Sequence, residues 1–370
     1  MLKFREWVSP EGVRQIELLP EGLPTRQSIE ARMGQWVEES DYDILLTGDA
    51  DVYGPADDTL EALGMDPEPI GEGRLLISFR KGVFPVDKCR EWHTLLRGAA
   101  GKSMNRGAAA GPLDMEYFRA RYGERMRVLS DNRISYTTED GLVSNVQVST
   151  PVNSGLVGFF NRTPRTPYCR QTAYTSKHAE EIGKCYEYFQ LISNRFKMQV
   201  PGRWANQNSF VESTGIREKG WCIPGTVFTT VTVNRNYRTG LHQDAGDLRE
   251  GFGNLTVLEG PGPRYEGGYT VFPQYRVAVD VRTGDFLGMD VHEFHGNTPI
   301  VGPEGHERVS VVCYTRVEMR GCGPWESERA REEEHLAKIP NPQHQHDANV
   351  LAVAREGQEF EAFMAELDGR

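Results

Sequence analysis

The sequence predicts a mainly β fold with flanking helices, of the α+β class, built on a jelly-roll or sandwich core. After residue 226 the chain carries short apolar runs rich in β-branched residues, and Gly or Pro turns separate them. Six or more short strands at such spacing are typical of sandwiches and jelly rolls. The runs are Val227–Val233, Leu255–Leu258, Tyr269–Phe272, Val277–Val281, Asp285–Met289 and Val309–Tyr314.

Helical patterns precede these strands. Residues Lys88–Arg97 have a helical pattern, and His178–Lys197 is the longest amphipathic pattern, with apolar residues recurring near every 3.6 positions. A glycine-rich loop, Gly101–Gly111, lies between the two. We therefore expect helices beside the sheets and not within them.

Three segments are expected along the chain. Residues 1–84 look like an N-terminal module of unknown role, with short strands such as Asp43–Leu46 and Arg74–Phe79. Residues 85–317 form the predicted jelly-roll domain. Residues 318–370 are a charged C-terminal tail, helical over part of its length, with one amphipathic pattern at 348–367.

The formal net charge of −11 argues against a protein that coats nucleic acid nonspecifically, because such proteins are normally basic. Charge is unevenly distributed, however. Between Asn161 and Ala205 there are eight Lys or Arg residues against three Glu residues. This basic stretch is either an ordinary solvated helix face or a surface that holds a polyanion.

Nothing in the sequence suggests a membrane or secreted protein. No run approaches the roughly 18 apolar residues that a membrane span needs, and the first residues do not form an apolar leader. The six cysteines are scattered without a Cys-x-x-Cys pair, so neither a zinc ribbon nor a disulfide framework is expected. Reduced thiols and a cytoplasmic location, in a bacterial or phage-infected cell, are the expectation.

A candidate metal site follows from three residues. His242 and Asp244 lie two positions apart in Thr239–Asp247, which we expect to be a strand, so both side chains point to one face. His295 comes later, at the far end of the strand Asp285–Met289. A jelly roll brings such segments together at the mouth of the barrel. Two histidines and one carboxylate form the facial ligand set of non-haem Fe(II) oxygenases.

An arginine follows the metal site. Arg308 and Ser310 alternate on one face of an apolar strand. A guanidinium can bind a carboxylate through two parallel hydrogen bonds, and the serine hydroxyl can add a third. An inward-facing arginine on such a strand needs an anionic partner, because a buried unpaired charge is costly. The pair therefore suggests a site for a dicarboxylate cosubstrate, and a structural salt bridge is the alternative.

Other histidines compete for the same role. His292 could replace His295 as the distal ligand, but Gly296 follows His295 and lets the chain turn close to a metal. His178 and Glu180 repeat the His-x-acid pattern inside a predicted helix, where positions i and i+2 do not share a face. We expect His295 to be the ligand and His178 to lie on the surface.

Several segments of the chain resemble the TET/J-binding-protein branch of Fe(II)- and 2-oxoglutarate-dependent dioxygenases, phage and bacterial members above all. The resemblance covers roughly residues 86–316 and is most specific from Thr232 to Ser310. The segments that carry it are Ser103–Gly111, Tyr168–Thr175, Thr232–Leu248, Gly267–Pro273 and His292–Thr298.

The resemblance implies a double-stranded β-helix, Fe(II) and 2-oxoglutarate as cofactors, and O2 as cosubstrate. It implies hydroxylation of the 5-methyl group of a pyrimidine in DNA, most simply 5-methylcytosine to 5-hydroxymethylcytosine. His242, Asp244 and His295 match the metal ligands, and Arg308 matches the cosubstrate arginine. Arg170 and Asn234 fall in motifs that line the cosubstrate or base pocket. The cysteine-rich zinc module of animal TET enzymes is absent, so no zinc is expected.

A base inside a duplex cannot reach a metal in a barrel, so the target base is expected to flip out. The basic stretch is the candidate surface for the DNA backbone. Thymine oxidised to 5-hydroxymethyluracil is the main alternative. A dioxygenase acting on a free nucleotide, small metabolite or protein side chain, a jelly roll that binds without catalysis, and a structural interaction protein remain as further hypotheses. Protein partners and oligomeric state are left open.

Overall fold

The protein is described from a computed structural model, which covers residues 2–55, 73–137, 147–164 and 166–338. The helix expected over 348–367 lies outside these residues, as does Arg165 of the basic stretch.

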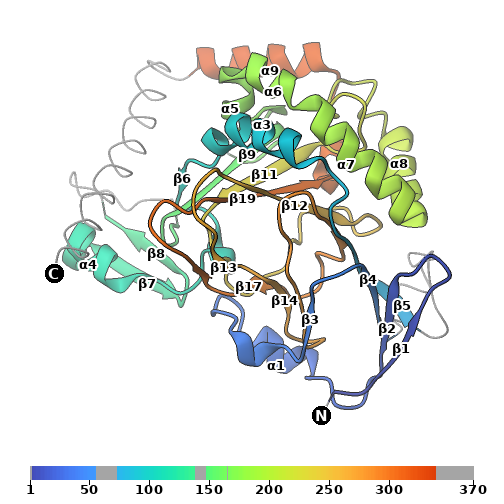
Figure 1. Ribbon diagram of the computed structural model, residues 1–370. Helices are drawn as coiled ribbons and strands as arrows, with labels where there is room; N and C mark the ends of the chain where they lie inside the picture. Colours follow the sequence, from blue (N-terminus) through green and yellow to red (C-terminus); the bar gives the residue numbers. More distant parts are fainter. Residues whose placement is uncertain (1, 56–72, 138–146, 165, 339–370) are drawn as a thin grey trace.

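Two β-sheets dominate the fold (Figure 1). In the larger sheet the order of strands is β1 (Phe4–Val8), β2 (Arg14–Leu18), β4 (Ala50–Pro55), β5 (Gly73–Arg80), β16 (Phe286–Met289), β12 (Gly253–Glu259), β19 (Arg308–Tyr314), β11 (Thr230–Arg235), β9 (Val152–Phe160) and β10 (Arg170–Gln171), with β6 (Lys102–Ser103) also on β9. The smaller sheet runs β17 (Gly296–Asn297), β14 (Thr270–Phe272), β15 (Val277–Val279) and β3 (Ile44–Leu46). Strands β13 (Glu266–Gly267) and β18 (Ile300–Val301) pair with each other, as do β7 (Met126–Ser130) and β8 (Arg133–Tyr136).

The strand order confirms the predicted class, a mainly β protein with helices and a jelly-roll core. Neighbours in the larger sheet are distant in sequence: β19 lies between β12 and β11 and is antiparallel to both. This crossing places Ser310 opposite Asn234 on one side and Val257 on the other. The strands that were predicted from β-branched runs are all present, with ends shifted by a few residues.

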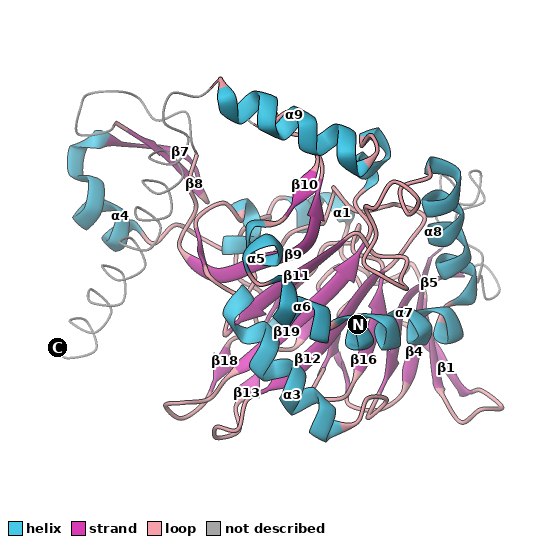
Figure 2. Cartoon of the chain, turned by 90° about the horizontal axis from the view of Figure 1, so that it is seen from above, coloured by secondary structure: helices cyan, strands magenta, loops and turns pink. Residues whose placement is uncertain are grey.

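Helices cover one face of the larger sheet. Figure 1 shows them above it, with the smaller sheet and α1 (Arg26–Glu30) below, and Figure 2 shows the same helices from above. They are α3 (Val86–Leu96), α5 (Ala173–Lys177), α6 (Ala179–Lys184), α7 (Tyr186–Gln199), α8 (Pro201–Thr214) and α9 (Trp325–Ala337). Short 3₁₀ helices span Glu39–Asp41, Arg97–Ala99, Gly107–Ala110, Gly123–Arg125 and Val317–Gly321.

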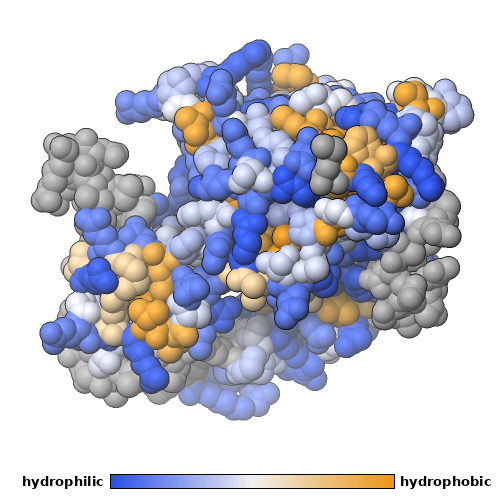
Figure 3. All heavy atoms as spheres, turned by 90° about the horizontal axis from the view of Figure 1, so that it is seen from below, coloured by the Kyte–Doolittle hydropathy of each residue, from blue (hydrophilic) through white to orange (hydrophobic). Residues whose placement is uncertain are grey.

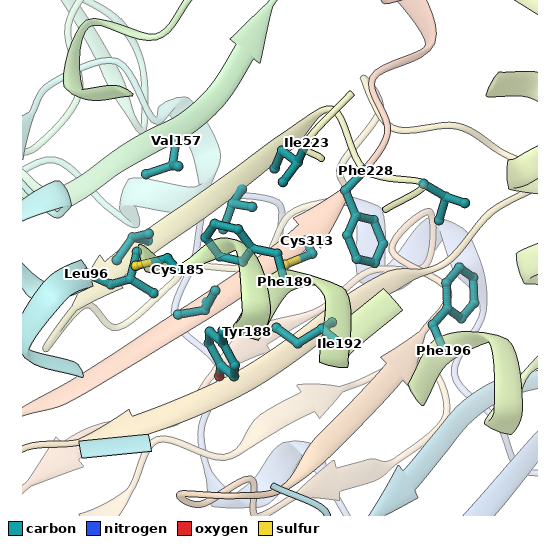
Figure 4. Packing of buried hydrophobic residues seen from close by; sticks show 14 of the residues in the cluster. Leu96, Val157, Cys185, Tyr188, Phe189, Ile192, Phe196, Ile223, Phe228 and Cys313 are labelled. Atoms are coloured by element: carbon teal, nitrogen blue, oxygen red, sulfur yellow. The ribbon is translucent and has the colours of Figure 1, made fainter. Parts of the chain in front are cut away.

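The apolar stripe of the long amphipathic pattern explains this layer. Tyr188, Phe189, Ile192 and Phe196 of α7 are fully buried and pack on residues of the sheet such as Cys313 (Figure 4). The predicted single helix over 178–197 is divided at residue 185 into α6 and α7. Helix α8 was not predicted, although a proline at its start and a left-handed glycine at its end are ordinary boundary signals.

The first 84 residues share both sheets with the rest of the chain. Strand β5 is antiparallel to β16, and β3 is parallel to β15. Between the sheets, Val52 and Ile77 pack in the same buried cluster as Leu255 and Phe272. The expected boundary near residue 84 therefore does not interrupt the hydrogen bonding of either sheet.

A small wing projects to one side of the two sheets, formed by α4 (Met115–Tyr122), β7 and β8 (Figures 1 and 2). Its own core includes the stacked rings of Tyr122 and Tyr136, 4.4 Å apart. Val128 and Leu129 of β7 are about half exposed, and Figure 3 shows apolar atoms gathered on this side of the molecule.

The expectation for the cysteines was wrong for two of them. A disulfide joins Cys169 to Cys322, which are 153 residues apart. Sequence spacing does not reveal such a pair, because the fold alone brings the two segments together. Cys89, Cys185, Cys222 and Cys313 are free thiols. Among the described residues, no helix has the length and apolar character needed to cross a membrane.

Candidate active site

His242 and His295 face each other across a single antiparallel bridge. The main-chain N–H of His242 donates to the carbonyl of His295 (2.9 Å), and the N–H of His295 donates back to the carbonyl of His242 (3.0 Å). This reciprocal pair places the two imidazole rings 4.4 Å apart. Main-chain hydrogen bonds therefore hold these two residues, which are distant in the sequence, side by side.

The strand expected over 239–247 is reduced to two isolated bridges, His242 with His295 and Asp247 with Arg316. The N–H of Gly240 donates to Ala109, that of Leu241 to Gln35 and that of Asp244 to Val291. Because these donors pair with different segments, no regular ladder forms. His242 and Asp244 are nevertheless close together, as expected, because Nε2 of His242 lies 3.7 Å from Oδ1 of Asp244.

Both imidazoles are oriented for metal binding. Nδ1 of His242 donates to the carbonyl of Gly240 (2.8 Å), and Nδ1 of His295 donates to the carbonyl of Glu293 (2.9 Å). A carbonyl can only accept, so each Nδ1 carries the proton and each Nε2 of the neutral ring keeps its lone pair. Both Nε2 atoms point toward the carboxylate of Asp244, 3.7 Å away in each case.

The trio of His242, Asp244 and His295 offers three ligand atoms within 4.8 Å of one another. Burial, and then the neighbouring imidazole of His242, lower the pKa of His295 to about 4, so this ring is neutral at pH 7. Asp244 is more exposed than either histidine, with 37% of its side chain accessible. The trio is thus open on the carboxylate side. His292, the competing histidine, lies outside the group.

A pocket of roughly 640 Å³ contains the trio. Alternate residues of β19 determine its position: Val309, Val311 and Cys313 pack against the helices, whereas Ser310 and Tyr314 line the pocket. The pocket therefore occupies the face of the larger sheet that the helices leave free. It carries polar groups without a hydrogen-bond partner among the described residues, namely the buried hydroxyl of Tyr237 and the buried Nε of Arg106.

Arg308 is 2% exposed, and no described residue hydrogen-bonds to its Nε or Nη2. Gly268, at φ +70°, lies against it, and a Cβ at this position would be 3.2 Å from Nε. A buried guanidinium without an acceptor is costly unless an anion completes it. The alternative, a structural salt bridge, is not present in the described part of the chain, and the side chain is suited to a carboxylate ligand.

Asn234 and Arg170 occupy different places. Asn234 lines the trio's pocket opposite Ser310 in the sheet register, and its Oδ1 accepts a hydrogen bond from the hydroxyl of Ser154. Arg170 lines an adjoining pocket instead, where Nη1 donates to Thr166 Oγ1 (2.8 Å). The structure therefore brings Asn234 to the trio's pocket and keeps Arg170 outside its lining.

The basic stretch does not form one continuous surface beside the trio. Helices α6 and α7, which carry several of its cations, cover the opposite face of the larger sheet. Arg203 is fully buried, and Arg162 forms an ion pair with Glu328. The cations of α6 and α7 therefore cannot hold a polyanion next to the site, and of the described cations of the stretch only Arg170 lines a pocket that adjoins it. A count along the sequence does not show which face each cation occupies.

Sequence reasoning missed a charged cluster behind His295. Arg74 of β5 forms ion pairs with Asp290 (3.0 Å) and Glu293 (2.6 Å), and all three side chains are almost fully buried. Asp290 also accepts the main-chain N–H of His292 (3.1 Å). More than two hundred residues separate Arg74 from its partners. No local signal in the sequence could have revealed the cluster.

Comparison with known families gives a match over residues 155–317 to Tet_JBP, the oxygenase domain of the 2OGFeDO superfamily. The bifunctional helicase and thymine dioxygenase JBP2 of Trypanosoma brucei brucei is 34% identical over 178 residues, which are 47% of this chain and 16% of that protein. The thymine dioxygenase JBP1 of Trypanosoma brucei brucei is 34% identical over 169 residues, 44% of this chain and 19% of that protein. The chain thus spans less than a fifth of the length of these relatives.

Among solved structures, NgTET1 in complex with 5mC DNA aligns with a TM-score of 0.46 and 11% sequence identity. The alignment covers 84% of this chain and 100% of that chain.

Proposed function

Residues 155–317 belong to the TET/JBP oxygenase family, and on this basis we propose that the protein hydroxylates the 5-methyl group of a pyrimidine in DNA. The family uses Fe(II) and 2-oxoglutarate. We propose 5-methylcytosine as the substrate base and 5-hydroxymethylcytosine as the product. The second candidate is thymine oxidised to 5-hydroxymethyluracil, because the JBP2 and JBP1 relatives are thymine dioxygenases.

The observation that carries the proposal is the orientation of the trio. His242 and His295 are both fixed by Nδ1 hydrogen bonds that leave Nε2 free, and both Nε2 atoms converge on Asp244. This donor set fits Fe(II) in a facial arrangement with coordination positions left open. These three residues would hold the metal.

Arg308 and Ser310 supply the proposed cosubstrate site. The unpartnered Nε and Nη2 of Arg308 fit the distal carboxylate of 2-oxoglutarate, and Ser310 lies on the pocket wall two residues further along β19. Together, bound Fe(II) and 2-oxoglutarate supply oxidation by O2, in which one oxygen atom enters the methyl C–H bond and the other enters succinate as CO2 is lost. The protein contributes ligand geometry, cosubstrate orientation and a pocket that limits water.

The position of the trio bears on how DNA is bound. Residues of both sheets, such as Leu255 and Asn297, line the pocket around it. A methyl group that stays stacked within a duplex cannot reach such a site, so the target nucleotide is flipped out. Tyr237 is suited to meet the flipped base, because its buried hydroxyl has no hydrogen-bond partner among the described residues.

Nucleoside mass spectrometry tests the proposal. DNA co-expressed with the protein, with and without a cytosine-5 methyltransferase, is digested and compared with DNA from cells carrying Asp244→Ala. Hydroxymethylcytosine that requires both the methyltransferase and Asp244 supports the first candidate. Hydroxymethyluracil without the methyltransferase supports the second. Oxidation of a free 5-methyl nucleotide but of neither DNA would overturn the assignment of DNA as substrate.

A further inference from the structure

A second pocket, of roughly 560 Å³, adjoins the trio's pocket. We call it the annex. Arg106, Ser154, Tyr314 and Arg316 line both cavities, so the two share a wall. The annex extends from this wall toward Arg170 on β10, away from the metal ligands.

The charged side chains that line the annex are all positive. They are Lys102, Arg106, Arg170 and Arg316, and no Asp or Glu belongs to the lining that the described residues form. The chain as a whole carries a formal net charge of −11. A cavity lined by four cations in an acidic protein is a local reversal of charge, and it attracts anions.

Two of these guanidiniums form cation–π contacts with the same aromatic ring. Arg316 lies 4.2 Å and Arg170 lies 5.2 Å from the centre of the Phe160 ring. These contacts hold both guanidiniums near the ring without neutralising their charge. Their side-chain hydrogen bonds go to neutral oxygens, from Arg170 to Thr166 and from Arg316 to Asn161 (2.8 Å each).

Within the described chain, neither arginine forms an ion pair, although carboxylates pair with many other arginines of this protein. The buried Nε of Arg106 also has no hydrogen-bond partner there. Glu332 acts on Arg170 and Asp247 acts on Arg316 only from beyond ion-pair distance. Partly buried guanidiniums without a carboxylate in contact are costly to the fold. A bound anion offsets that cost, and planar guanidiniums suit the oxygens of a phosphate.

We propose that the annex binds a backbone phosphate of the DNA strand beside the flipped nucleotide. This inference rests on the proposed function and extends it. Because the pockets share a wall, a nucleotide whose base lies at the trio can direct its phosphate toward Arg170 and Arg316. Such a contact fixes the position of the DNA strand and does not distinguish one base sequence from another. The phosphate of a free nucleotide presents the same chemistry, and the experiment separates the two sources.

The test compares Arg170→Gln with Lys184→Gln. Both variants remove one positive charge, but Lys184 is an exposed residue of α6 that pairs with Glu180. Binding of a 5-methylcytosine duplex is measured by fluorescence anisotropy across a range of salt concentrations. Loss of one phosphate contact lowers the slope of log affinity against log salt by about 0.9 and weakens binding roughly tenfold or more. We expect this for Arg170→Gln alone, with the KM for 2-oxoglutarate unchanged.

A chemical probe tests the same contact from the DNA side. Single neutral methylphosphonates are placed in turn at the phosphates flanking the target base. Wild type is expected to bind the DNA more weakly than unmodified DNA when one particular phosphate is neutral. Arg170→Gln, which already lacks the contact, is expected to bind that modified DNA almost as well as it binds unmodified DNA. If the affinity loss from the methylphosphonate adds to the loss from Arg170→Gln at every position, the two do not act on one contact and the proposal is overturned. A raised KM for 2-oxoglutarate in Arg170→Gln would also overturn it.

The remaining outcomes separate this inference from the proposed function. If wild type oxidises DNA and Arg170→Gln keeps the full salt slope, the annex proposal fails and the function stands. If wild type oxidises only free substrates, the DNA assignment fails, and 5-methyldeoxycytidine is compared with its 5′-monophosphate. A KM advantage for the monophosphate that disappears in Arg170→Gln then retains the annex as a phosphate site, and no advantage rejects it.

Discussion

Arg74 and Glu293 form a buried ion pair, with Nη2 and Oε1 2.6 Å apart, that ties the first 84 residues to the trio of His242, Asp244 and His295. Glu293 also accepts a hydrogen bond on its main-chain carbonyl from Nδ1 of His295. The hydroxyl of Tyr275 donates to the other carboxylate oxygen of Glu293 (2.9 Å). The turn that carries His295 is therefore held both from β5 and from the turn between β14 and β15.

Replacing Arg74 by Met is expected to lower the free energy of unfolding by about 3–5 kcal/mol, because Asp290 and Glu293 are left buried with less compensation. Urea denaturation measures the loss. The control is Arg5→Met, since Arg5 is 69% exposed in its pair with Glu17 and should cost at most about 1 kcal/mol. Equal losses in both variants would show that the buried pair has no special role.

Replacing Asp244 by Ala should abolish succinate release that depends on Fe(II) and 2-oxoglutarate. Loss of a metal ligand costs more than the roughly 10–100-fold typical of residues behind the ligands. The melting temperature should change little, because the side chain is partly exposed. Asp87→Ala, at a 98% exposed position on α3, serves as the control. Retained turnover in Asp244→Ala would remove this residue from the metal site.

Replacing Arg308 by Met should raise the KM for 2-oxoglutarate about 10–100-fold, which corresponds to losing charge-assisted hydrogen bonds worth about 1.5–3 kcal/mol. The free protein should not be destabilised strongly, since Nε and Nη2 have no partner to lose among the described residues. Steady-state kinetics at saturating DNA measure the effect. An unchanged KM, or a loss confined to the DNA substrate, would contradict the assigned role.

Glu328 provides a pH-dependent prediction far from the trio. Burial raises its pKa, but the Arg162 guanidinium and the N–H groups of Cys169 and Gly323 outweigh burial and lower the pKa from 4.5 to about 2. The carboxylate therefore stabilises the fold fully above about pH 4.5 and loses this contribution as the pH falls toward 2.

The stability difference between wild type and Glu328→Gln should accordingly be greatest near neutral pH. It should shrink by about 3 kcal/mol on acidification from pH 5 to pH 2. Chemical denaturation at a series of pH values provides the measurement, and Glu333→Gln, on the exposed side of α9, is the matched control. A difference that stays constant with pH would show that Glu328 acts through packing alone.

Local pattern was enough to predict much of the fold. Runs such as Val309–Tyr314 alternate between two buried faces, and the apolar stripe of α7 recurs at helical spacing. Such patterns arise from residues that are close together in the sequence. The strands and the amphipathic helical segment lie where these patterns predict them. The pairing of β5 with β16 could not be predicted from local pattern. Which strands pair depends on which strand edges, often distant in the sequence, the folded chain brings together.

The sequence by itself determined the residue types of the trio, the arginine behind them and the mainly β character of the chain. Only the tertiary structure decided that His242 and His295 face each other, that Cys169 meets Cys322, and that α6 and α7 carry their cations on the far face of the larger sheet while Arg170 lines the annex. The reason is physical: composition and periodicity report what each segment prefers to bury, whereas long-range contacts depend on how all segments pack together.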